Sequence, residues 1–229
     1  MARPLVSESS TLQFLTDQAA KRGNGTCGDP TSSQESLARE YGFESWTELI
    51  QYARNCCVLL DKSTLKFTRK LRVDLPTAWK FISVAEELST WMFETKLELR
   101  VGGRFEFPTW GGVIEKLEHL NCIRFRADEG GYSEFQIESA GPQQTAARVI
   151  DYLPGHLEVP GHVKSELDEI GSSQPGGPGT HWAGVLAGWH SGSDSLEAYA
   201  RNEQPRAKYG PLVRVYSDLV AAFHNSAGS

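Results

Sequence analysis

Apolar and polar residues alternate along most of the chain between residues 63 and 152, as they do in β-strands that bury one face. Six runs of this kind begin near Leu65, Leu97, Val113, Ile123, Phe135 and Ala147. The second run continues past Gly102-Gly103 to Phe105 and Phe107, and the breaks between the later runs hold glycine, asparagine or proline. Because no helix-length segment separates these later runs, we expect an antiparallel meander of about six strands.

Apolar residues at helical spacing predict a second set of elements before, within and after the sheet. These helices are expected at residues 11–22, 32–41, 45–54, 76–82, 86–91, 182–199 and 212–223. Two of them open with capping boxes, in which a serine and a glutamate satisfy backbone N–H groups at the helix start: Ser32 with Glu35, and Ser45 with Glu48. Pro76 suits the first turn of another helix.

Together these elements predict an α+β fold in which a curved antiparallel sheet of about six strands surrounds a long C-terminal helix. We expect residues 1–62 to form an N-terminal helical hairpin, residues 63–203 the sheet domain and residues 204–229 a C-terminal amphipathic helix. Residues 154–180 hold four prolines and six glycines and are predicted to form one long, lid-like loop. One helix covers only part of a twisted sheet, so an apolar hollow is expected between them.

Several short motifs occur in the order found in one known superfamily. They are Ala78-Trp79, Trp91, Val101-Gly-Gly-Arg-Phe-Glu-Phe, Gly112-Val-Ile-Glu, and Gly188-Trp189 followed by Leu196. Through this order and spacing, residues 65–202 resemble the START-like superfamily (SRPBCC, helix-grip fold). The similarity is to the branch related to the activator of the heat-shock-protein ATPase and to polyketide cyclase-like proteins.

The resemblance implies the helix-grip fold and a range of activities rather than one. Members bind apolar molecules, cyclise polyketides in secondary metabolism, act as self-resistance proteins or assist chaperones, and the fold alone does not choose among these. The long loop before Thr180 and the helix after Gly210 depart from the compact family pattern. With these two additions, the entrance to the pocket is not expected to have the form that is usual in the family.

Composition and charge narrow the classes of function. The chain has 229 residues, a net charge of −6 and no block of lysines, which argues against non-specific binding to nucleic acid or to an anionic membrane. No apolar run is long enough to cross a bilayer, and Met1-Ala-Arg-Pro does not begin a secretory signal. We therefore expect a cytoplasmic protein, with a protein partner left open as well as a small molecule.

The cysteines and histidines do not predict a metal site. None of the four cysteines stands in a CxxC pair, and all are expected to be free thiols. His156, His162 and His181 are separated by glycine-rich sequence and contain no close-spaced ligand pair. A phosphate-binding loop, a Rossmann glycine pattern and a nucleophile elbow are missing from the sequence, so no cofactor is expected either.

Glu115 is the first candidate for proton transfer. Val113 and Leu117 bracket it two residues away, so its carboxylate shares their face of the strand. If that face is concave, burial raises the pKa of Glu115, as general acid–base chemistry requires. The alternative is that Ile114 and Lys116 set the phase and leave Glu115 in solvent, since a buried unpaired charge is costly.

Asp151 is the second candidate. Ala147 and Val149 bring it onto their face near the end of the last strand. The alternative is a surface salt bridge between Asp151 and a nearby arginine, Arg148 or Arg124.

His181, beside the long loop, is the third candidate, because histidine exchanges protons near neutral pH; the alternative is an exposed helix cap. Aromatic side chains are candidates for contacts with a planar or polycyclic ligand, or else for the core. They are Trp79, Trp91, Phe105, Phe107, Trp110, Phe125, Phe135, Tyr152, Trp182 and Trp189.

The leading hypothesis is a protein that binds an apolar, polycyclic or polyketide-like molecule in an internal cavity. It either sequesters that molecule or, as a cofactor-free cyclase or lyase, acts on it by general acid–base chemistry. A second hypothesis is an interaction module of the co-chaperone type, with an exposed apolar patch on residues 32–55 or 212–223. A third, a helix-turn-helix regulator, is weakened because its recognition helix would hold a single basic residue, Arg54.

Overall fold

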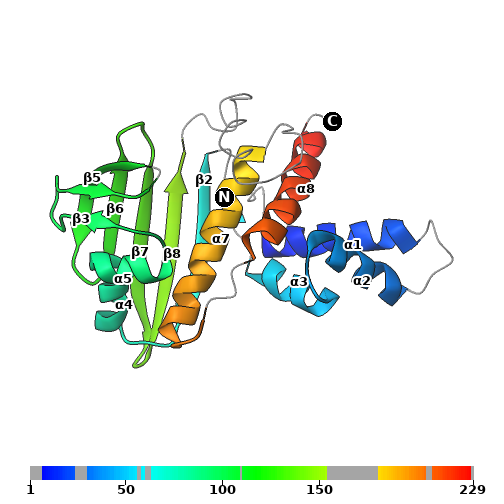
Figure 1. The fold of residues 1–229 in the computed structure, drawn as a ribbon, viewed down its shortest axis with the longest axis horizontal. Helices are drawn as coiled ribbons and strands as arrows, with labels where there is room; N and C mark the ends of the chain where they lie inside the picture. Colours follow the sequence, from blue (N-terminus) through cyan, green and yellow to red (C-terminus); the bar gives the residue numbers. More distant parts are fainter. Residues whose placement is uncertain are drawn as a thin grey trace. The chain divides into compact units, whose positions relative to one another are not determined.

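The computed structural model describes residues 7–23, 30–55, 58–59, 63–108, 110–153, 180–204 and 208–227. The chain forms two compact units. The helical unit comprises the described parts of Met1–Lys62, Gly155–His190 and Lys208–Ser229, and the sheet unit those of Ser63–Pro154 and Ser191–Ala207. Helix α7 (Thr180–Ala200) contributes residues 180–190 to the helical unit and residues 191–200 to the sheet unit (Figure 1).

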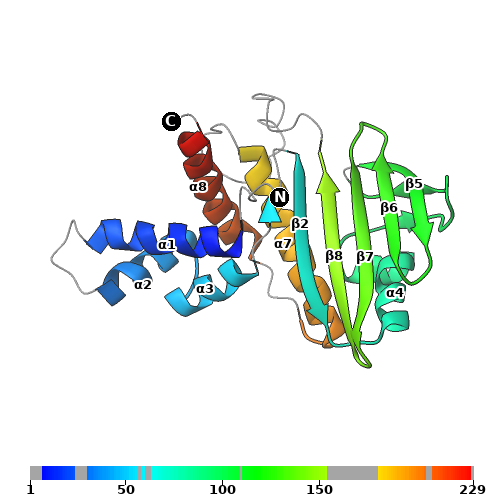
Figure 2. The same cartoon turned by 180° about the vertical axis from the view of Figure 1, so that it is seen from behind.

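The sheet unit is built on a curved antiparallel sheet with the strand order β2-β8-β7-β6-β5-β4-β3 (Figure 2). Its strands are β2 (Thr64–Leu71), β3 (Lys96–Leu97), β4 (Arg104–Glu106), β5 (Gly111–Glu118), β6 (Cys122–Ala127), β7 (Tyr132–Gly141) and β8 (Gln144–Tyr152). Strands β3 to β8 follow one another as a meander, and β2 pairs with β8 at the far side. The α+β architecture predicted from the sequence is confirmed, with seven strands in this unit instead of about six.

Helices α4 (Leu75–Ser83) and α5 (Ala85–Trp91) connect β2 to β3 and lie on one face of the sheet, which residues 191–200 of α7 share (Figures 1 and 2). We call this the inner face. Helix α4 begins where expected, because the Asp74 side chain accepts a hydrogen bond from the backbone N–H of Thr77 and Pro76 occupies the first turn. The indole of Trp91 donates to the Phe81 carbonyl oxygen at 2.9 Å and joins the two helices.

The hairpin between β3 and β4 differs from its prediction. Only Lys96 and Leu97 pair as a strand, and the next apolar residues, Leu99 and Val101, are 42% and 62% exposed. The cause is the turn at Gly102-Gly103: a Cβ atom on Gly103 would lie 2.1 Å from the carbonyl oxygen of Glu98. The tight backbone crossing at this glycine ends the alternation that the sequence pattern continues.

The helical unit contains α1 (Glu8–Gly23), α2 (Pro30–Tyr41), α3 (Trp46–Arg54), α8 (Tyr209–Ala227) and the short strand β1 (Val58–Leu59). The capping residue predicted for α3 is correct, since Ser45 Oγ accepts from the Glu48 N–H at 3.2 Å. The capping box predicted for α2 is wrong. The helix starts at Pro30, before Ser32, and the carboxylate of Glu35 instead accepts from the backbone N–H of Trp46 at the start of α3.

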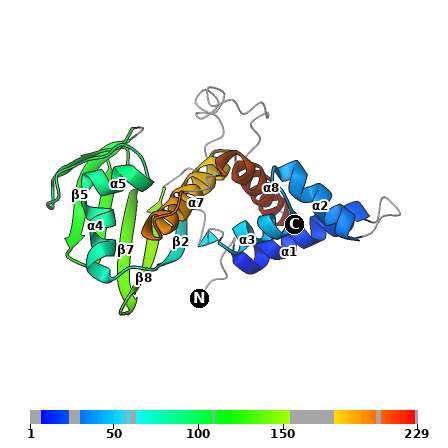
Figure 3. The ribbon, with the colours of Figure 1, turned by 60° about the horizontal axis from the view of Figure 1, so that its bottom comes forward.

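Helix α8 packs its apolar side on the other helices of this unit (Figure 3). The buried side chains, each at most 5% exposed, are Leu212, Val215, Tyr216 and Leu219. The Tyr41 hydroxyl of α2 donates to Asp218 Oδ2 at 2.7 Å and ties the two helices together. The described apolar face of α8 is therefore part of a core, and the exposed patch that the interaction hypothesis expected there is not found.

Burial of Tyr41 gives an expected pH dependence of stability. Burial, followed by the hydrogen bond to Asp218, raises the pKa of Tyr41 above its ordinary value near 10. Because the pKa of Tyr41 is higher in the folded than in the unfolded protein, its contribution to folding stability is fully present below about pH 10. This contribution is lost as the pH rises further. Denaturant unfolding at pH 8 to 11 should show wild type losing up to ~1.4 kcal/mol per pH unit above pH 10 relative to Tyr41→Phe. Parallel pH profiles for the two proteins would contradict this assignment.

Candidate functional site

One half of the inner face is filled with large aromatic side chains. Phe105 on β4, Phe125 on β6 and Phe135 on β7 are at most 2% exposed, and their rings contact one another at 5.1 and 5.3 Å between centroids. Phe107 and Trp110 join them at 4.8 to 5.7 Å. Tilted and edge-on rings at these distances are typical of packed cores. These five ligand candidates therefore contact one another closely in the structure.

The other half of the inner face carries small side chains. On strand β8 they are Thr145, Ala147 and Val149, each at most 7% exposed. On α7, Asp194 bonds to Arg69 of β2, so the helix face that holds Ser191, Ser195 and Ala198 points toward the sheet. Ser191 Oγ is buried and has no hydrogen-bond partner among the residues that the structure describes. Both β8 and this face of α7 thus bury short side chains, in contrast to the aromatic half.

Asp151 lies on the inner face at the end of β8, with Ala147 and Val149, and not in a surface salt bridge with Arg148 or Arg124. It is 4% exposed, and the Ser133 hydroxyl of β7 donates to its Oδ1. A buried carboxylate needs such donors, because burial penalises its charged form. Asp151 is consequently a carboxylate able to accept a hydrogen bond or a proton inside the sheet unit.

A buried cation, Arg69, also faces inward from β2. Its Nε and Nη2 donate to Asp194 Oδ1 at 3.1 and 2.7 Å, and Glu197 lies 3.9 Å away. With its side chain only 4% exposed, this ion pair fastens the second half of α7 to the sheet. Arg69 was not among the predicted site residues, although its place in the apolar phase of β2, two residues after Phe67, is a sequence signal for it.

Glu115 lies on the outer face of the sheet. Ile114, its neighbour, is buried opposite Phe125, and Glu115 is in solvent as the alternative expected, although a register shift between Ile114 and Lys116 means that these two residues do not share one phase. Its side chain is 36% exposed and forms ion pairs with Arg126 at 3.0 Å and Arg124 at 3.5 Å. The structure thus leaves this carboxylate partly exposed and paired with two arginines, and we do not retain it as a proton carrier.

The remaining candidates are spread over several places. Tyr152 points to the outer face, where its ring lies 5.5 Å from that of Tyr132; adjacent strand residues face opposite ways, so Tyr152 cannot line the same face as Asp151. Trp79 and Trp91 are buried on α4 and α5. Trp189 is half-buried on the α7 segment of the helical unit.

Some predictions fall on parts of the chain that the structure does not describe. His181 and Trp182 belong to the start of α7, but their side chains lie outside the described residues, and so do residues 154–179, predicted as a loop. Across the described ranges, His, Cys, Asp and Glu side chains nowhere form a group of three or more that could hold a metal ion. Within the same ranges, none of the helices is both long and apolar enough to span a membrane.

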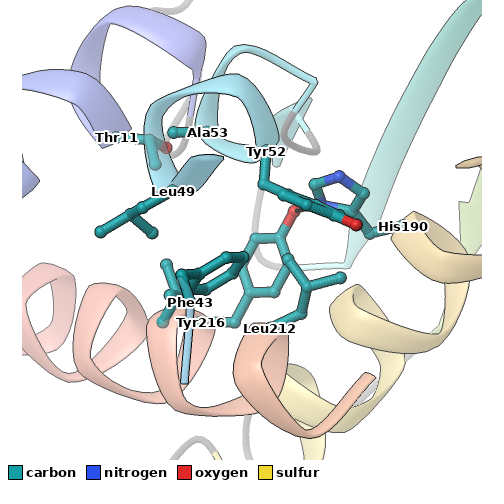
Figure 4. Close-up of a pocket in the computed structure, with 9 residues that line it drawn as sticks. Thr11, Phe43, Leu49, Tyr52, Ala53, His190, Leu212 and Tyr216 are labelled. Atoms are coloured by element: carbon teal, nitrogen blue, oxygen red, sulfur yellow. Dashed lines mark hydrogen bonds between the residues drawn. The ribbon is translucent and has the colours of Figure 1, made fainter. Parts of the chain in front are cut away.

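A small pocket in the helical unit was not foreseen from the sequence (Figure 4). Its lining residues come from α1, the α2–α3 turn, α3, α7 and α8: Thr11, Phe43, Leu49, Tyr52, Ala53, His190, Leu212, Val215 and Tyr216. The His190 ring is 1% exposed, and its Nδ1 lies 2.8 Å from the Tyr216 hydroxyl. The pocket encloses about 240 Å³ including the open space at its mouth, less than the ~300 Å³ at which ligand pockets usually begin.

The thiol of Cys122 is unsuited to covalent chemistry. It is 1% exposed on β6, and burial raises its pKa, which suppresses the reactive thiolate.

The fold defines the class of the sheet unit: it is a helix-grip α+β fold, in which an antiparallel sheet curves around helices on its inner face. No family model and no curated protein matches the sequence. Among solved structures, CalU16 from Micromonospora echinospora is similar with a TM-score of 0.51 and 14% identity, over 72% of this chain and 88% of that chain.

A second solved structure supports the same fold. The protein encoded by gene BPP1335 from Bordetella parapertussis matches with a TM-score of 0.50 and 14% identity, over 70% of this chain and 86% of that chain. The HSP90 activator PFC0360w from Plasmodium falciparum is also similar, but its TM-score of 0.39, with 15% identity over 49% of this chain and 89% of that chain, supports no conclusion. At these identities the likenesses establish the fold and no activity.

Proposed function

We propose that the sheet unit binds an apolar small molecule on the small-residue half of its inner face. The observation that carries this proposal is the burial of short side chains on both elements, Ala147 on β8 and Ser195 and Ala198 on α7, together with the buried carboxylate of Asp151. Ligand sites are usually apolar interiors with a few placed polar groups, and this region has that composition. The aromatic cluster next to it supplies a rigid wall of π-faces against which a planar molecule can stack.

The proposal also includes catalysis, in which the sheet unit converts the bound molecule as well as binding it. Cyclisation or dehydration of a bound polyketide-like chain needs a group that takes and returns a proton, and a site that holds the chain folded. Asp151 is the proton carrier that we assign to this role, because it is buried on the proposed binding face and positioned by Ser133. Sequestration of the molecule without turnover requires the same binding face and no reaction at Asp151.

Filling the small-residue half is expected to abolish binding. In Ala147→Leu the larger side chain occupies the proposed ligand volume, so the affinity for the neutral fluorescent probe N-phenyl-1-naphthylamine should fall at least ~10-fold, equivalent to ~1.4 kcal/mol. The matched control is Ala146→Leu, because Ala146 is the preceding residue of β8 and faces the outer side. Probe fluorescence measures affinity, and thermal unfolding checks that both variants fold.

The proposal predicts that wild type and Ala146→Leu bind the probe alike while Ala147→Leu does not. Equal affinity in all three folded proteins would show that the probe binds at another site. If the probe does not bind wild type at all, the proposed function is wrong. Overpacking by the extra methyl groups is expected to cost ~1–3 kcal/mol of stability in Ala147→Leu, so the measurement is made well below its unfolding temperature.

A further inference from the structure

One buried hydroxyl group of the sheet unit, that of Ser191 on α7, makes no hydrogen bond to any residue that the structure describes. A serine inside a helix can donate to the carbonyl oxygen four residues earlier, but Ser191 Oγ does not. A buried hydroxyl in this state has given up the hydrogen bonds that water would make, which is unfavourable. A bound molecule with an acceptor atom would restore one of these bonds.

The place of Ser191 follows from that of Asp194, one turn further along α7. Residues three apart lie on the same side of a helix, and Asp194 reaches Arg69, which faces inward from β2. Helix α7 and strand β2 run in the same direction (Figures 1 and 2), so Ser191 lies toward the start of β2 relative to Arg69. On the neighbouring strand β8 this direction leads from Ala147, the partner of Arg69, to Val149. The Ser191 hydroxyl is thus placed on the small-residue half of the inner face.

Arg69, the buried cation on this face, is fully engaged within the protein. Its Nε and Nη2 donate to Asp194 at 3.1 and 2.7 Å, and its Nη1 donates to the Thr68 carbonyl oxygen at 3.0 Å. A carboxylate taken out of water needs a cation or several donors beside it, and this guanidinium has all three nitrogens in use. The small-residue half therefore suits an uncharged molecule better than an acid.

We propose that the molecule bound on this face is uncharged and carries an acceptor oxygen, such as that of a ketone, to which the Ser191 hydroxyl donates. This inference rests on the proposed function, and it names the chemical class of the ligand and a residue that selects for it. The apolar body of the molecule lies against the short side chains of β8 and α7, and the hydrogen bond fixes its orientation. A hydrocarbon of the same shape leaves the buried hydroxyl unpaired.

Three ligands of nearly one shape separate the chemical classes. 2-Acetylnaphthalene presents a ketone oxygen. 2-Isopropenylnaphthalene replaces that oxygen with a methylene group, and 2-naphthoic acid replaces the methyl group with an oxygen that is negative at pH 7. Their affinities are measured by displacement of N-phenyl-1-naphthylamine from the full-length protein. We expect wild type to bind the ketone at least ~10-fold more tightly than the acid.

Ser191→Ala tests the assignment to that hydroxyl. The ratio of ketone affinity to hydrocarbon affinity should fall at least ~5-fold from wild type to Ser191→Ala, because only the ketone uses the hydroxyl. Comparing this ratio between the two proteins removes the difference in water solubility of the ligands. Alanine favours a helix, so Ser191→Ala should fold, and thermal unfolding checks this.

The matched control is Ser193→Ala. Ser193 is also a buried serine of α7, 3% exposed, but residues two apart on a helix do not share a side. Its ratio of ketone to hydrocarbon affinity should equal that of wild type.

Each other outcome counts against a stated part of the argument. An unchanged ratio in Ser191→Ala overturns the inference, while the binding function stands. A fall of the same size in Ser193→Ala overturns it too, because the selection then does not belong to Ser191. If the acid displaces the probe from wild type as well as the ketone does, the proposed ligand class is wrong. If N-phenyl-1-naphthylamine does not bind wild type, the proposed function itself fails.

Discussion

Gly112→Ala is expected to destabilise the sheet unit by about 3 kcal/mol, near the upper end of what overpacking costs. Gly112 sits on β5 between two neighbouring strands, opposite Phe105 of β4 and Ala127 of β6. A Cβ atom there would lie 1.9 Å from the carbonyl oxygen of Arg126 and 3.0 Å from the Phe105 ring. The first contact is with backbone, which cannot rotate away, so the strands themselves must separate. Denaturant unfolding followed by circular dichroism measures the loss.

Gly188→Ala is the matched control for this substitution. Gly188 lies inside helix α7, and a Cβ atom there meets no heavy atom within 4 Å. Alanine in an open helical position should increase stability by ~0.5–1 kcal/mol, because it restricts the unfolded chain and favours the helix. The same methyl group is therefore predicted to have opposite signs at the two glycines. A Gly112→Ala protein as stable as wild type would show that the strands are not packed as closely as the structure has them.

Phe125→Ala is expected to cost ~3–5 kcal/mol, the range for removing a buried phenylalanine ring. The Phe125 ring is 0% exposed and contacts Phe105, Phe107 and Phe135 at 5.1 to 5.7 Å. If this ring is part of the core, its removal leaves a cavity in the aromatic half and lowers the free energy of unfolding. The measurement is the free energy of unfolding, with probe affinity determined on the same samples at low temperature.

Val101→Ala serves as the comparison, because Val101 is 62% exposed at the β3–β4 turn and should change stability by less than ~0.5 kcal/mol. A different result for Phe125→Ala would revise its role. If the variant keeps wild-type stability but loses the probe, Phe125 contacts the ligand directly and the aromatic half is part of the binding face. If it loses stability and still binds the probe when folded, the aromatic cluster is the wall behind the site.

The strands were predictable where one face is buried without interruption. In β2 and β8 the buried residues recur every second position, since a sheet with one covered face imposes that period. The run from Leu97 to Val101 has the same period, yet only its first residues pair. The alternating pattern reflects only the polarity of the side chains, whereas a strand also needs a neighbouring strand to pair with. The turn at Gly102-Gly103 leaves the residues just before it without such pairing.

The starts of the helices likewise show that a local sequence pattern predicts only those contacts that are formed within a few residues. Ser45 caps α3 through a contact three residues away, so a local pattern sufficed. Glu35 was assigned to a local capping box in α2, but it accepts from the N–H of Trp46, which lies in the next helix. A carboxylate in a helical hairpin has more than one helix end within reach, and the packing of α2 on α3 decides which one it satisfies.

Asp151 and Glu115 show when the alternation of apolar and polar residues predicts the strand face on which a side chain lies, and when it does not. Along β8 the alternation is regular, and it placed Asp151 with Ala147 and Val149. Along β5 the register shifts between Ile114 and Lys116, so the residues around Glu115 do not keep one phase. A bulge of this kind depends on the pairing with β6 and leaves no mark in the sequence of β5 itself.

The sequence by itself determined the α+β class, the positions of most helices and strands and their order along the chain, because each element carries its own polarity period. Only the tertiary structure decided which face of each strand turns inward, that Arg69 meets Asp194 and that Ser133 meets Asp151. It likewise decided that the ligand candidates on β4, β6 and β7 pack against one another, while β8 and α7 bury small residues. The reason is physical: amphipathic patterns are local, but register and packing minimise the free energy of contacts between residues far apart in the chain.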